Sequence, residues 1–249
     1  MVLRVGVLGA KGRMGAAVCK AISEAPDMKL VAALDAGDVV STLASEGANV
    51  VVDFTTPDVV MNHLDWLIQN GVHAVVGTTG FTDERIAQVQ KWSTESPKTG
   101  ILIAPNFSIG AILMTRFASE ATRFFESVEI VELHHPDKID APSGTSVHTA
   151  KAIANARKSA KMPAQPDATE AKYMDARGVS VEGVPIHSVR LRGLVAHQEV
   201  IFGDTGELFT IRHDSFDRSA YMPGVLAGVR GVFEHPGLTI GLDKYLGLK

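Results

Sequence analysis

Residues 3–24 read LRVGVLGAKGRMGAAVCKAISE. The nearly continuous apolar run over 3–8 predicts a buried β-strand, and apolar side chains at helical spacing over 16–24 predict an α-helix. Gly9, Gly12 and Gly15 occupy the turn between them. A strand, a glycine-rich turn and a helix in immediate succession are typical of the first βαβ unit of a dinucleotide-binding domain.

The first hundred residues repeat this alternation of short apolar runs and helical patterns. Pro57 is placed in the first turn of the helix that follows the third strand, a position where proline is tolerated. Runs of Val, Ile and Leu without polar interruption indicate strands buried on both faces, as in a parallel sheet between helices. We therefore predict an α/β fold with a Rossmann-type doubly wound parallel sheet. The further strands are predicted at 30–34, 50–53, 73–76 and 101–104, with helices ending at Gln69 and spanning 83–92.

The rhythm changes after residue 106. A long helix over 109–125, a strand over 128–133 and a helix reaching residue 160 precede a segment, 161–185, whose Pro, Asp and Gly content predicts mostly loop. Three strand-like runs follow, and Gly203-Asp-Thr-Gly206 between the last two is a hairpin signal. Residues 107–214 thus predict a second α+β domain with a mixed or antiparallel sheet. Residues 1–106 and 215–249, with a helix over 223–233, are assigned to the Rossmann domain. The three runs cover 187–191, 197–202 and 207–213.

Composition narrows the class of protein. The 249 residues carry a formal net charge of -4 and are 45% hydrophobic, which gives a sizeable core and no basic footprint for nucleic acid. No apolar run approaches the ~20 residues of a membrane span, and the apolar N-terminal run is too short for a signal peptide. The single cysteine, Cys19, cannot form an internal disulfide and is expected to be a buried packing thiol. A cytoplasmic enzyme of small metabolites is the expectation.

The glycine-rich turn predicts a cofactor site. Its spacing is G-x-x-G-x-x-G, which departs from the strict dinucleotide pattern, but glycines let the backbone approach a pyrophosphate at the helix N-terminus. Asp35 ends the second strand, where an acid binds ribose hydroxyls and disfavours a 2′-phosphate; Lys11 and Arg13 could counter that effect. We expect NADH and/or NADPH, with some preference for NADH. A plain glycine turn beside a solvated aspartate is the alternative.

Three more strand ends are expected to meet at the same crevice, since ligands of doubly wound sheets bind outside the carboxyl ends of the strands. These are Phe54-Thr55, Gly77-Thr78-Thr79 and Ala104-Pro105-Asn106-Phe107. Each alone could be ordinary turn chemistry. Together they predict a cofactor-binding edge.

The densest polar cluster reads ELHHPDKIDAPSGT over residues 132–145. Ser143 is a candidate N-cap, after which Gly144 and Thr145 would offer free N–H groups to an anion, with Lys138 as a nearby positive charge. A histidine at this position suits proton transfer near neutral pH. His134-His135 could instead be a polar strand end. The cluster lacks the H-x-x-x-H or C-x-x-C spacing typical of zinc ligands, so no metal is expected.

This cluster closely resembles the signature of the dihydrodipicolinate reductase family. The resemblance extends in order to GAKGRMG at 9–15, VDFT at 52–55, VGTTGF at 76–81 and APNFS at 104–108, and it is strongest to actinobacterial members. It implies transfer of hydride to a small cyclic dicarboxylic imine in the second committed step towards diaminopimelate and lysine. It also implies that residues 107–214 form a substrate-binding and oligomerisation domain, whose sheet joins the subunits of a homotetramer.

The resemblance further implies residue roles. His134 would be the general acid/base and Lys138 a second proton donor or carboxylate partner. The substrate would be bound by His135, Ser143, Gly144 and Thr145. The cofactor would be bound by Gly9, Ala10, Lys11, Gly12, Arg13, Met14, Asp35, Phe54, Gly77, Thr78, Thr79, Ala104, Pro105, Asn106 and Phe107.

Two alternatives stay open on the residues alone. Another two-domain Rossmann oxidoreductase, such as an amino-acid or sugar dehydrogenase, would explain the first hundred residues but not the cluster at 132–145. A catalytically idle NAD-binding sensor or regulatory subunit would lack acid/base residues, whereas His134 and Lys138 are both present.

Overall fold

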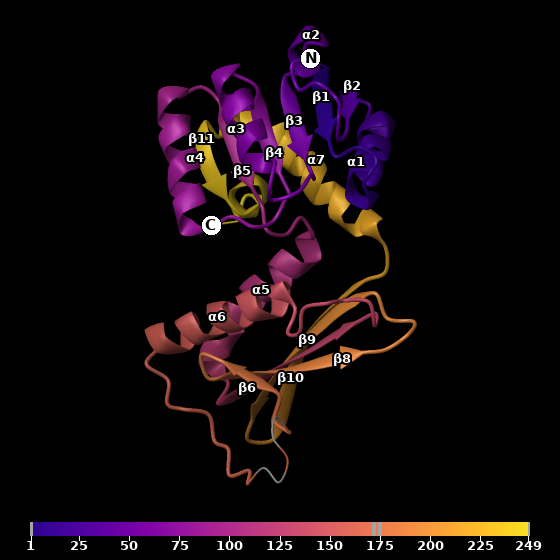
Figure 1. Cartoon of the computed structure of the whole chain (residues 1–249). Helices are drawn as coiled ribbons and strands as arrows, with labels where there is room; N and C mark the ends of the chain where they lie inside the picture. Colours follow the sequence, from indigo (N-terminus) through magenta and orange to yellow (C-terminus); the bar gives the residue numbers. More distant parts are fainter. Residues whose placement is uncertain (1, 171–172, 174–175, 249) are drawn as a thin grey trace. The chain divides into compact units, whose positions relative to one another are not determined.

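Figure 1 shows a computed structural model of the chain, which describes residues 2–170, 173 and 176–248. The chain divides into two compact units: unit 1 is Met1–Ser108 with Arg218–Lys249, and unit 2 is Ile109–Asp217. The boundaries expected from the sequence, after residues 106 and 214, fall two and three residues earlier. Phe107 belongs to unit 1 because its side chain is buried there, with its ring centroid 5.7 Å from that of Phe54.

Unit 1 is built on a six-stranded sheet in the order β11-β5-β4-β3-β1-β2, with every neighbouring pair parallel. The Rossmann-type doubly wound parallel sheet predicted from the sequence is therefore confirmed. The strands are β1 (Leu3–Leu8), β2 (Met28–Leu34), β3 (Val50–Asp53), β4 (His73–Val76), β5 (Gly100–Ile103) and β11 (Gly237–Ile240).

Helices cover both faces of this sheet, which is why its strands read as unbroken apolar runs. On one face, Leu64 of α3 and Val89 of α4 pack with strand residues such as Val51; α3 and α4 lie next to each other in Figure 1. On the other face, Gly228 of α7 comes so close that an added Cβ would lie 2.8 Å from the side chain of Leu102. The unit 1 helices are α1 (Arg13–Glu24), α2 (Thr42–Ser45), α3 (Val60–Gln69), α4 (Asp83–Glu95) and α7 (Met222–Gly231), with 3₁₀ turns η2 (Arg218–Tyr221), η3 (Val232–Glu234) and η4 (Asp243–Leu246).

The C-terminal segment completes unit 1. Strand β11 pairs with β5 from Gly237 opposite Gly100 onwards. Arg230 of α7 also donates two hydrogen bonds to the carboxylate of Asp27, at 2.7 and 3.0 Å. The sheet and this ion pair fasten residues 218–248 to the first half of the chain.

The order of the strands reverses between β1 and β3, which are neighbours in the sheet although β2 lies between them in sequence. Such a switch point opens a crevice at the carboxyl ends of the strands. Here the two ends approach closely, because a Cβ on Gly9 would lie 2.7 Å from the carbonyl oxygen of Phe54.

Unit 2 has a five-stranded mixed sheet in the order β10-β9-β6-β8-β7. The central strand β6 runs antiparallel to β9 and parallel to β8. Val128 and Ile130 of β6 pack against α5 and α6 in one core. The elements are α5 (Ile109–Ala121), η1 (Thr122–Phe124), β6 (Ser127–His134), α6 (Gly144–Ser159), β7 (Val179–Val181), β8 (Val184–Arg190), β9 (Ala196–Asp204) and β10 (Glu207–Ser215).

Residues 161–185 are mostly loop where the structure describes them, as expected, but β7 and the start of β8 also lie in them; buried Val184 joins the core, and Gly183 at φ +87° makes the turn between these strands. Two other local expectations need correction. The long helix ends at Ala121 rather than 125 and continues as the 3₁₀ turn η1. Pro57 lies in the turn before α3, which begins at Val60. Residues 171–172 and 174–175 of the expected loop lie outside the described residues.

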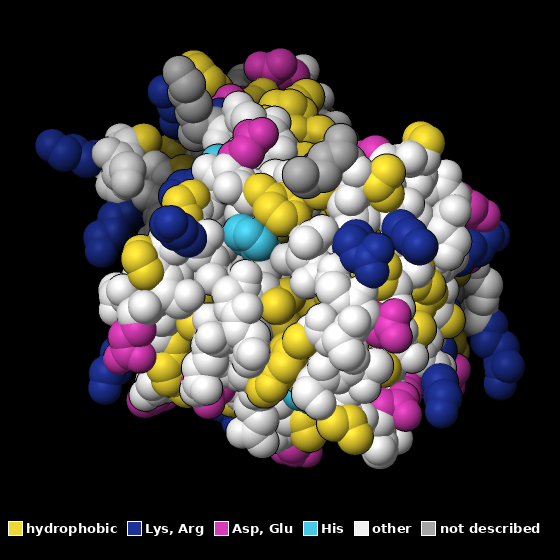
Figure 2. Space-filling model, turned by 90° about the horizontal axis from the view of Figure 1, so that it is seen from above, with side chains coloured by type: hydrophobic (Ala, Val, Ile, Leu, Met, Phe, Trp, Pro, Cys, Tyr) yellow, Lys and Arg dark blue, Asp and Glu magenta, His cyan; other side chains and the backbone are white. Residues whose placement is uncertain are grey.

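The exposed surface carries mixed charge. Lys and Arg side chains are interspersed with Asp and Glu side chains on the face shown in Figure 2. Within residues 2–170, 173 and 176–248, no helix has the length and apolar character needed to cross a membrane. Cys19 lies on α1 in a partly buried position, and this burial raises the pKa of its thiol.

His73 makes the stability of unit 1 depend on pH. Its Nδ1 accepts a hydrogen bond from the backbone N–H of Gly100 at 2.9 Å, and its ring packs 4.4 Å from that of Phe233. Burial lowers the pKa of His73 from the usual 6.5, so the unfolded chain binds this proton first as the pH falls below 6.5. The stability that depends on neutral His73 is therefore complete above pH 6.5 and declines below it.

We expect His73→Asn to weaken this pH dependence, because the amide oxygen replaces the Nδ1 acceptor but does not titrate. The measurement is the free energy of unfolding in urea between about pH 7.5 and about pH 5 for both proteins. The expected result is a smaller loss of stability in the variant. Parallel curves for the two proteins would remove His73 as the cause.

Candidate active site

The glycine-rich turn of unit 1 needs glycine for close approach of the backbone. Gly9 has φ +78°, a region that favours glycine. A Cβ on Gly15, in the first turn of α1, would lie only 2.0 Å from the carbonyl oxygen of Gly9. Helix α1 begins at Arg13, so the N–H groups at its start have no helix carbonyl four residues earlier to bind. This geometry fits an anionic group at the helix N-terminus.

Asp35 is tied to the same turn. Its Oδ2 accepts a hydrogen bond from the backbone N–H of Lys11 at 2.7 Å, and its Oδ1 accepts one from the N–H of Ala36 at 2.8 Å. The hydrogen bonds from Ala36 and Lys11 hold the pKa of Asp35 below its usual range. A fixed, ionised carboxylate thus stands at the end of β2, beside the turn. The sequence predicted this position but not the contact with Lys11.

Buried Asp53 joins two of the predicted strand ends. Its Oδ1 accepts hydrogen bonds from the backbone N–H of Thr55 at 2.9 Å, the hydroxyl of Thr55 at 2.6 Å and the hydroxyl of Thr78 at 2.9 Å. Its Oδ2 accepts one from Nδ1–H of His63 at 2.8 Å. The carboxylate therefore fixes the loop after β3 to the loop after β4. Neither Asp53 nor His63 was predicted as a site residue.

The remaining predicted cofactor residues follow the carboxyl ends of β4 and β5. A Cβ on Gly77 would lie 2.1 Å from the ring of Phe54, so that only glycine fits beside this ring. Ala104 and Phe107 are buried, whereas Thr79 and Pro105 are exposed. Asn106 accepts a hydrogen bond from the backbone N–H of Ser108 at 2.8 Å.

A fully buried carboxylate organises the cluster of unit 2. Glu132 lies on β6, and both its oxygens accept hydrogen bonds from the guanidinium of Arg190 on β8, at 2.9 Å each. Nδ1 of His134 lies at hydrogen-bond distance from the same carboxylate, 2.5 Å, and the N–H of Ser143 donates to it at 3.2 Å. Burial alone would raise the pKa of Glu132, but the hydrogen bonds from His134, Arg190 and Ser188 outweigh it and lower the pKa to about 2.

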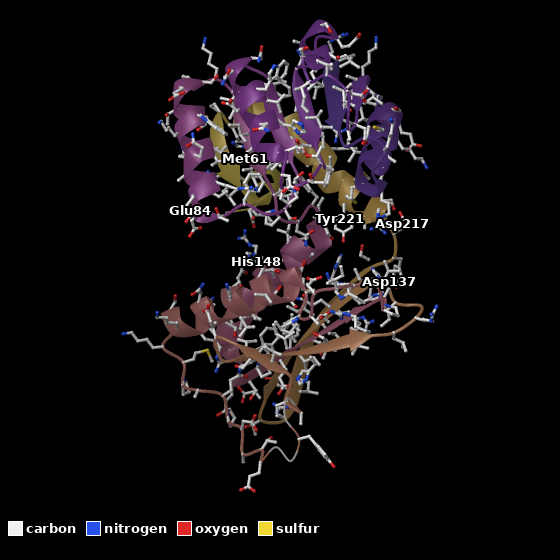
Figure 3. The ribbon with its side chains drawn as sticks, viewed as in Figure 1. Met61, Glu84, Asp137, His148, Asp217 and Tyr221 are labelled. Atoms are coloured by element: carbon white, nitrogen blue, oxygen red, sulfur yellow. The ribbon has the colours of Figure 1, made fainter. Side chains whose placement is uncertain are left out.

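The loop between β6 and α6, marked by Asp137 in Figure 3, carries Lys138. Its ammonium donates to Asp140 Oδ1 at 2.7 Å, while the N–H of Gly144 donates to Asp140 Oδ2 at 3.2 Å. The hydrogen bond from Lys138 holds the pKa of Asp140 below its usual range. The expectation that the N–H of Gly144 is free is wrong, because a nearby carboxylate of this chain already accepts it.

The predicted N-cap of α6 is confirmed. The hydroxyl of Ser143 accepts a hydrogen bond from the backbone N–H of Ser146 at 3.2 Å, and Ser143 itself is buried. Thr145 occupies the first turn of α6 and is partly buried. His135 is exposed, and its carbonyl accepts a hydrogen bond from the N–H of Lys138 at 3.2 Å.

The structure thus groups the predicted residues of unit 2 around two carboxylates, Glu132 and Asp140. Arg190 contacts both residues, since it donates to the carboxylate of Glu132 and also to the backbone carbonyl oxygen of Asp140, at 2.7 Å. None of these three residues was assigned a role from the sequence. Glu132 was detectable, because it continues the buried row of Val128 and Ile130 on β6, where a carboxylate requires partners. Over the described part of the chain, no group of three or more metal-ligating side chains comes together.

Comparison with known proteins covers almost the whole chain. The family described as dihydrodipicolinate reductase, N-terminus, matches residues 3–107, and the C-terminal family of the same name matches residues 110–246. A 4-hydroxy-tetrahydrodipicolinate reductase of Nocardia farcinica is 58% identical over 248 residues, which cover 100% of both chains. One of Corynebacterium diphtheriae is 56% identical over 248 residues, again covering 100% of both.

A solved structure agrees with these sequence matches. A dipicolinate-bound dihydrodipicolinate reductase from a Paenisporosarcina species superposes with a TM-score of 0.87 at 40% identity. The match covers 98% of this chain and 99% of that chain.

A parallel sheet with a glycine-rich turn at its switch point, together with an inserted α+β unit, defines the class of two-domain proteins that have a Rossmann-type dinucleotide-binding domain. Within this class, the matches identify a single family, and they cover nearly every residue of the chain. The chain belongs to the dihydrodipicolinate reductase family, and it is an enzyme of diaminopimelate and lysine biosynthesis.

Proposed function

We propose that the chain reduces the cyclic dicarboxylate formed from 4-hydroxy-tetrahydrodipicolinate to tetrahydrodipicolinate, with NADH or NADPH as the reductant. The observation that carries this proposal is the cluster of His134, Lys138 and the α6 N-terminus, set around the carboxylates of Glu132 and Asp140. A relative of 40% identity binds dipicolinate, a planar ring with two carboxylates. The same substrate chemistry is expected here.

The residues of unit 1 fit a dinucleotide. Gly9 and Gly15 leave no room for side chains at the turn, and Asp35 is held ionised beside it. The first-turn N–H groups of α1 would bind the pyrophosphate, and Asp35 would accept hydrogen bonds from a ribose. The bound cofactor supplies hydride from its nicotinamide. The other residues of the predicted edge, including Phe54, Thr78 and Asn106, would surround it.

The residues of unit 2 would supply charge and a proton. Lys138 and the N-terminus of α6 would hold a substrate carboxylate, with His135, Ser143 and Thr145 as further contacts. His134 would give a proton to the reduced ring from Nε2, because Nδ1–H is engaged by Glu132. For a carboxylate to use Lys138 and the N–H of Gly144, Asp140 must share or release them.

Assembly belongs to the same proposal. Apolar side chains of the unit 2 sheet, Val131, Ile201 and Leu208, lie on the face opposite the helices, and Leu208 is 77% exposed. A homotetramer joined through this sheet in the cytoplasm would cover them. Light scattering of the purified protein tests this directly, and a monomer mass would exclude it.

The test of the reaction is oxidation of NADH or NADPH by the purified protein, with substrate made in place by a dihydrodipicolinate synthase from pyruvate and aspartate semialdehyde. We expect turnover that depends on the synthase. If the cofactor binds but is not oxidised, the proposed reaction is wrong, and another two-domain dehydrogenase or an NAD-binding sensor becomes the better interpretation.

Asp35 is expected to set the preference between NADH and NADPH. The two variants separate its charge from its structural contact: Asp35→Asn keeps an acceptor for the N–H of Lys11, whereas Asp35→Ala removes it. Both should shift the ratio of kcat/KM for NADH over NADPH towards NADPH by roughly tenfold, about 1.4 kcal/mol. Only Asp35→Ala should also raise KM for both cofactors. An unchanged ratio in both variants would exclude Asp35 from discrimination.

A further inference from the structure

Arg190 has no role in the reaction as proposed so far, and Glu132 enters it only as the partner of Nδ1 of His134. Glu132 is 0% exposed, in a strand row that otherwise carries core side chains. A buried ion pair is weak support for stability, because the cost of desolvating both charges rivals their attraction. The arrangement therefore calls for an explanation beyond folding.

Glu132 and Arg190 bind each other and also bind neighbouring groups. Arg190 places one Nη on each oxygen of Glu132 and also donates to the carbonyl oxygens of Val189 and Asp140. Its buried Nε has no hydrogen-bond partner in the described part of the chain. The guanidinium is thus oriented by its Nη contacts, which connect β6 to the loop that carries Lys138.

We propose that Glu132 and Arg190 are positioning residues that fix His134 in the tautomer with the proton on Nδ1. This inference rests on the proposed role of His134 as the acid/base. Arg190 orients the Glu132 carboxylate, which can only accept, so the neutral imidazole must carry its proton on Nδ1. Nε2 then takes up a proton from solvent, and the resulting imidazolium gives that proton to the reduced ring and returns to the neutral Nδ1–H form.

The charged surroundings of His134 are few. Glu132 lies on its own strand, Arg190 stands opposite it on β8, and Ala196 stands opposite it on β9. Lys138 and Asp140 pair with each other in the following loop. In wild type, the positive charge of Arg190 offsets much of the negative charge of Glu132. If the charge of Glu132 is removed, a protonated His134 ring lies near the Arg190 guanidinium, whose charge is then no longer balanced by Glu132.

Glu132→Gln tests the pair, because glutamine keeps the shape and loses the charge. We expect kcat to fall about 100-fold with KM changed less than about threefold, and the pH at which activity falls to move downwards. Glu129→Gln is the matched control. Glu129 lies on the same strand and also binds an arginine and a histidine, Arg177 and His187, but faces away from the helices. Glu129 lies opposite Ile201 on the face proposed for assembly, so light scattering must first show that the variant keeps the wild-type mass. With the mass kept, Glu129→Gln should leave kcat and the pH profile unchanged.

Arg190→Lys provides a second route if the glutamine variant does not fold. Lysine keeps the positive charge but cannot contact both carboxylate oxygens in one plane, so we expect a smaller fall in kcat, about tenfold. Equal activity of wild type, Glu132→Gln and Arg190→Lys would overturn the proposal.

A measurement on the wild-type protein is independent of activity. Nitrogen NMR shifts of the His134 ring, assigned by loss of the signal in His134→Gln, report the tautomer at a pH where the ring is neutral. We expect the Nδ1–H form in wild type and a mixture in Glu132→Gln. The Nε2–H form in wild type would refute the inference, even if His134 proves essential. Wild-type turnover of a His134 variant would instead refute the proposed function.

Discussion

Replacing His134 or Lys138 by alanine is expected to lower kcat by about 10²–10⁴-fold, because each removes a group proposed to stabilise the transition state. Binding of NADH should remain nearly intact, since both side chains belong to unit 2 and the cofactor residues to unit 1. The measurements are steady-state turnover in the synthase-coupled assay and a fluorescence titration with NADH.

His148→Ala is the matched control for this pair. His148 is an exposed histidine on α6, labelled in Figure 3, and has no proposed role. It should turn over like the wild type. Wild-type turnover in both His134→Ala and Lys138→Ala would refute their assignment, whereas loss in one alone would leave the other as a binding group.

Gly15→Ala is expected to have the second largest effect. The added Cβ would lie 2.0 Å from the carbonyl oxygen of Gly9 and 2.9 Å from Cα of Ala10, so backbone rather than a flexible side chain must move. We expect a loss of about 1–3 kcal/mol in the free energy of unfolding and a cofactor affinity at least tenfold weaker. Urea unfolding and the NADH titration measure the two effects.

Gly12→Ala is the comparison for stability. Its Cβ would meet only the carbonyl oxygen of Gly9, at 3.1 Å, and Gly12 lacks a positive φ. The expected loss of stability is well below that of Gly15→Ala. Equal losses would show that helix-end propensity, and not the contact with Gly9, explains the effect.

The parallel sheet was predictable because its strands are buried on both faces. Val50, Val51 and Val52 are all fully buried, so the sequence shows an unbroken apolar run there. Strand β7 escaped detection because it is short and exposed, with only Val181 partly buried and with glycines on both sides. The local composition predicted a loop, whereas β7 is a strand because it pairs with β8, a contact that the sequence does not show.

The site divides in the same way. Ser143 was predictable as an N-cap because capping depends on neighbours within three residues. Arg190 was not, because its partner Glu132 lies 58 positions away in sequence and meets it only through the pairing of β6 with β8. Asp140 was overlooked for another reason: the sequence does not show that its carboxylate turns back to Lys138 and the helix N-terminus.

The place of β11 has a consequence for biogenesis. Its partner β5 is translated early, but all of unit 2 lies between β5 and β11 in the sequence, so Gly237 is made long after Gly100, with which it pairs. At about 5–20 residues per second, the outer edge of β5 has no partner for on the order of ten seconds of synthesis. An apolar strand with an open edge can pair with another chain, so a nascent chain is most exposed to aggregation in this interval. Slower elongation through unit 2 would lengthen that interval, and a ribosome-bound chaperone would be of most use within it.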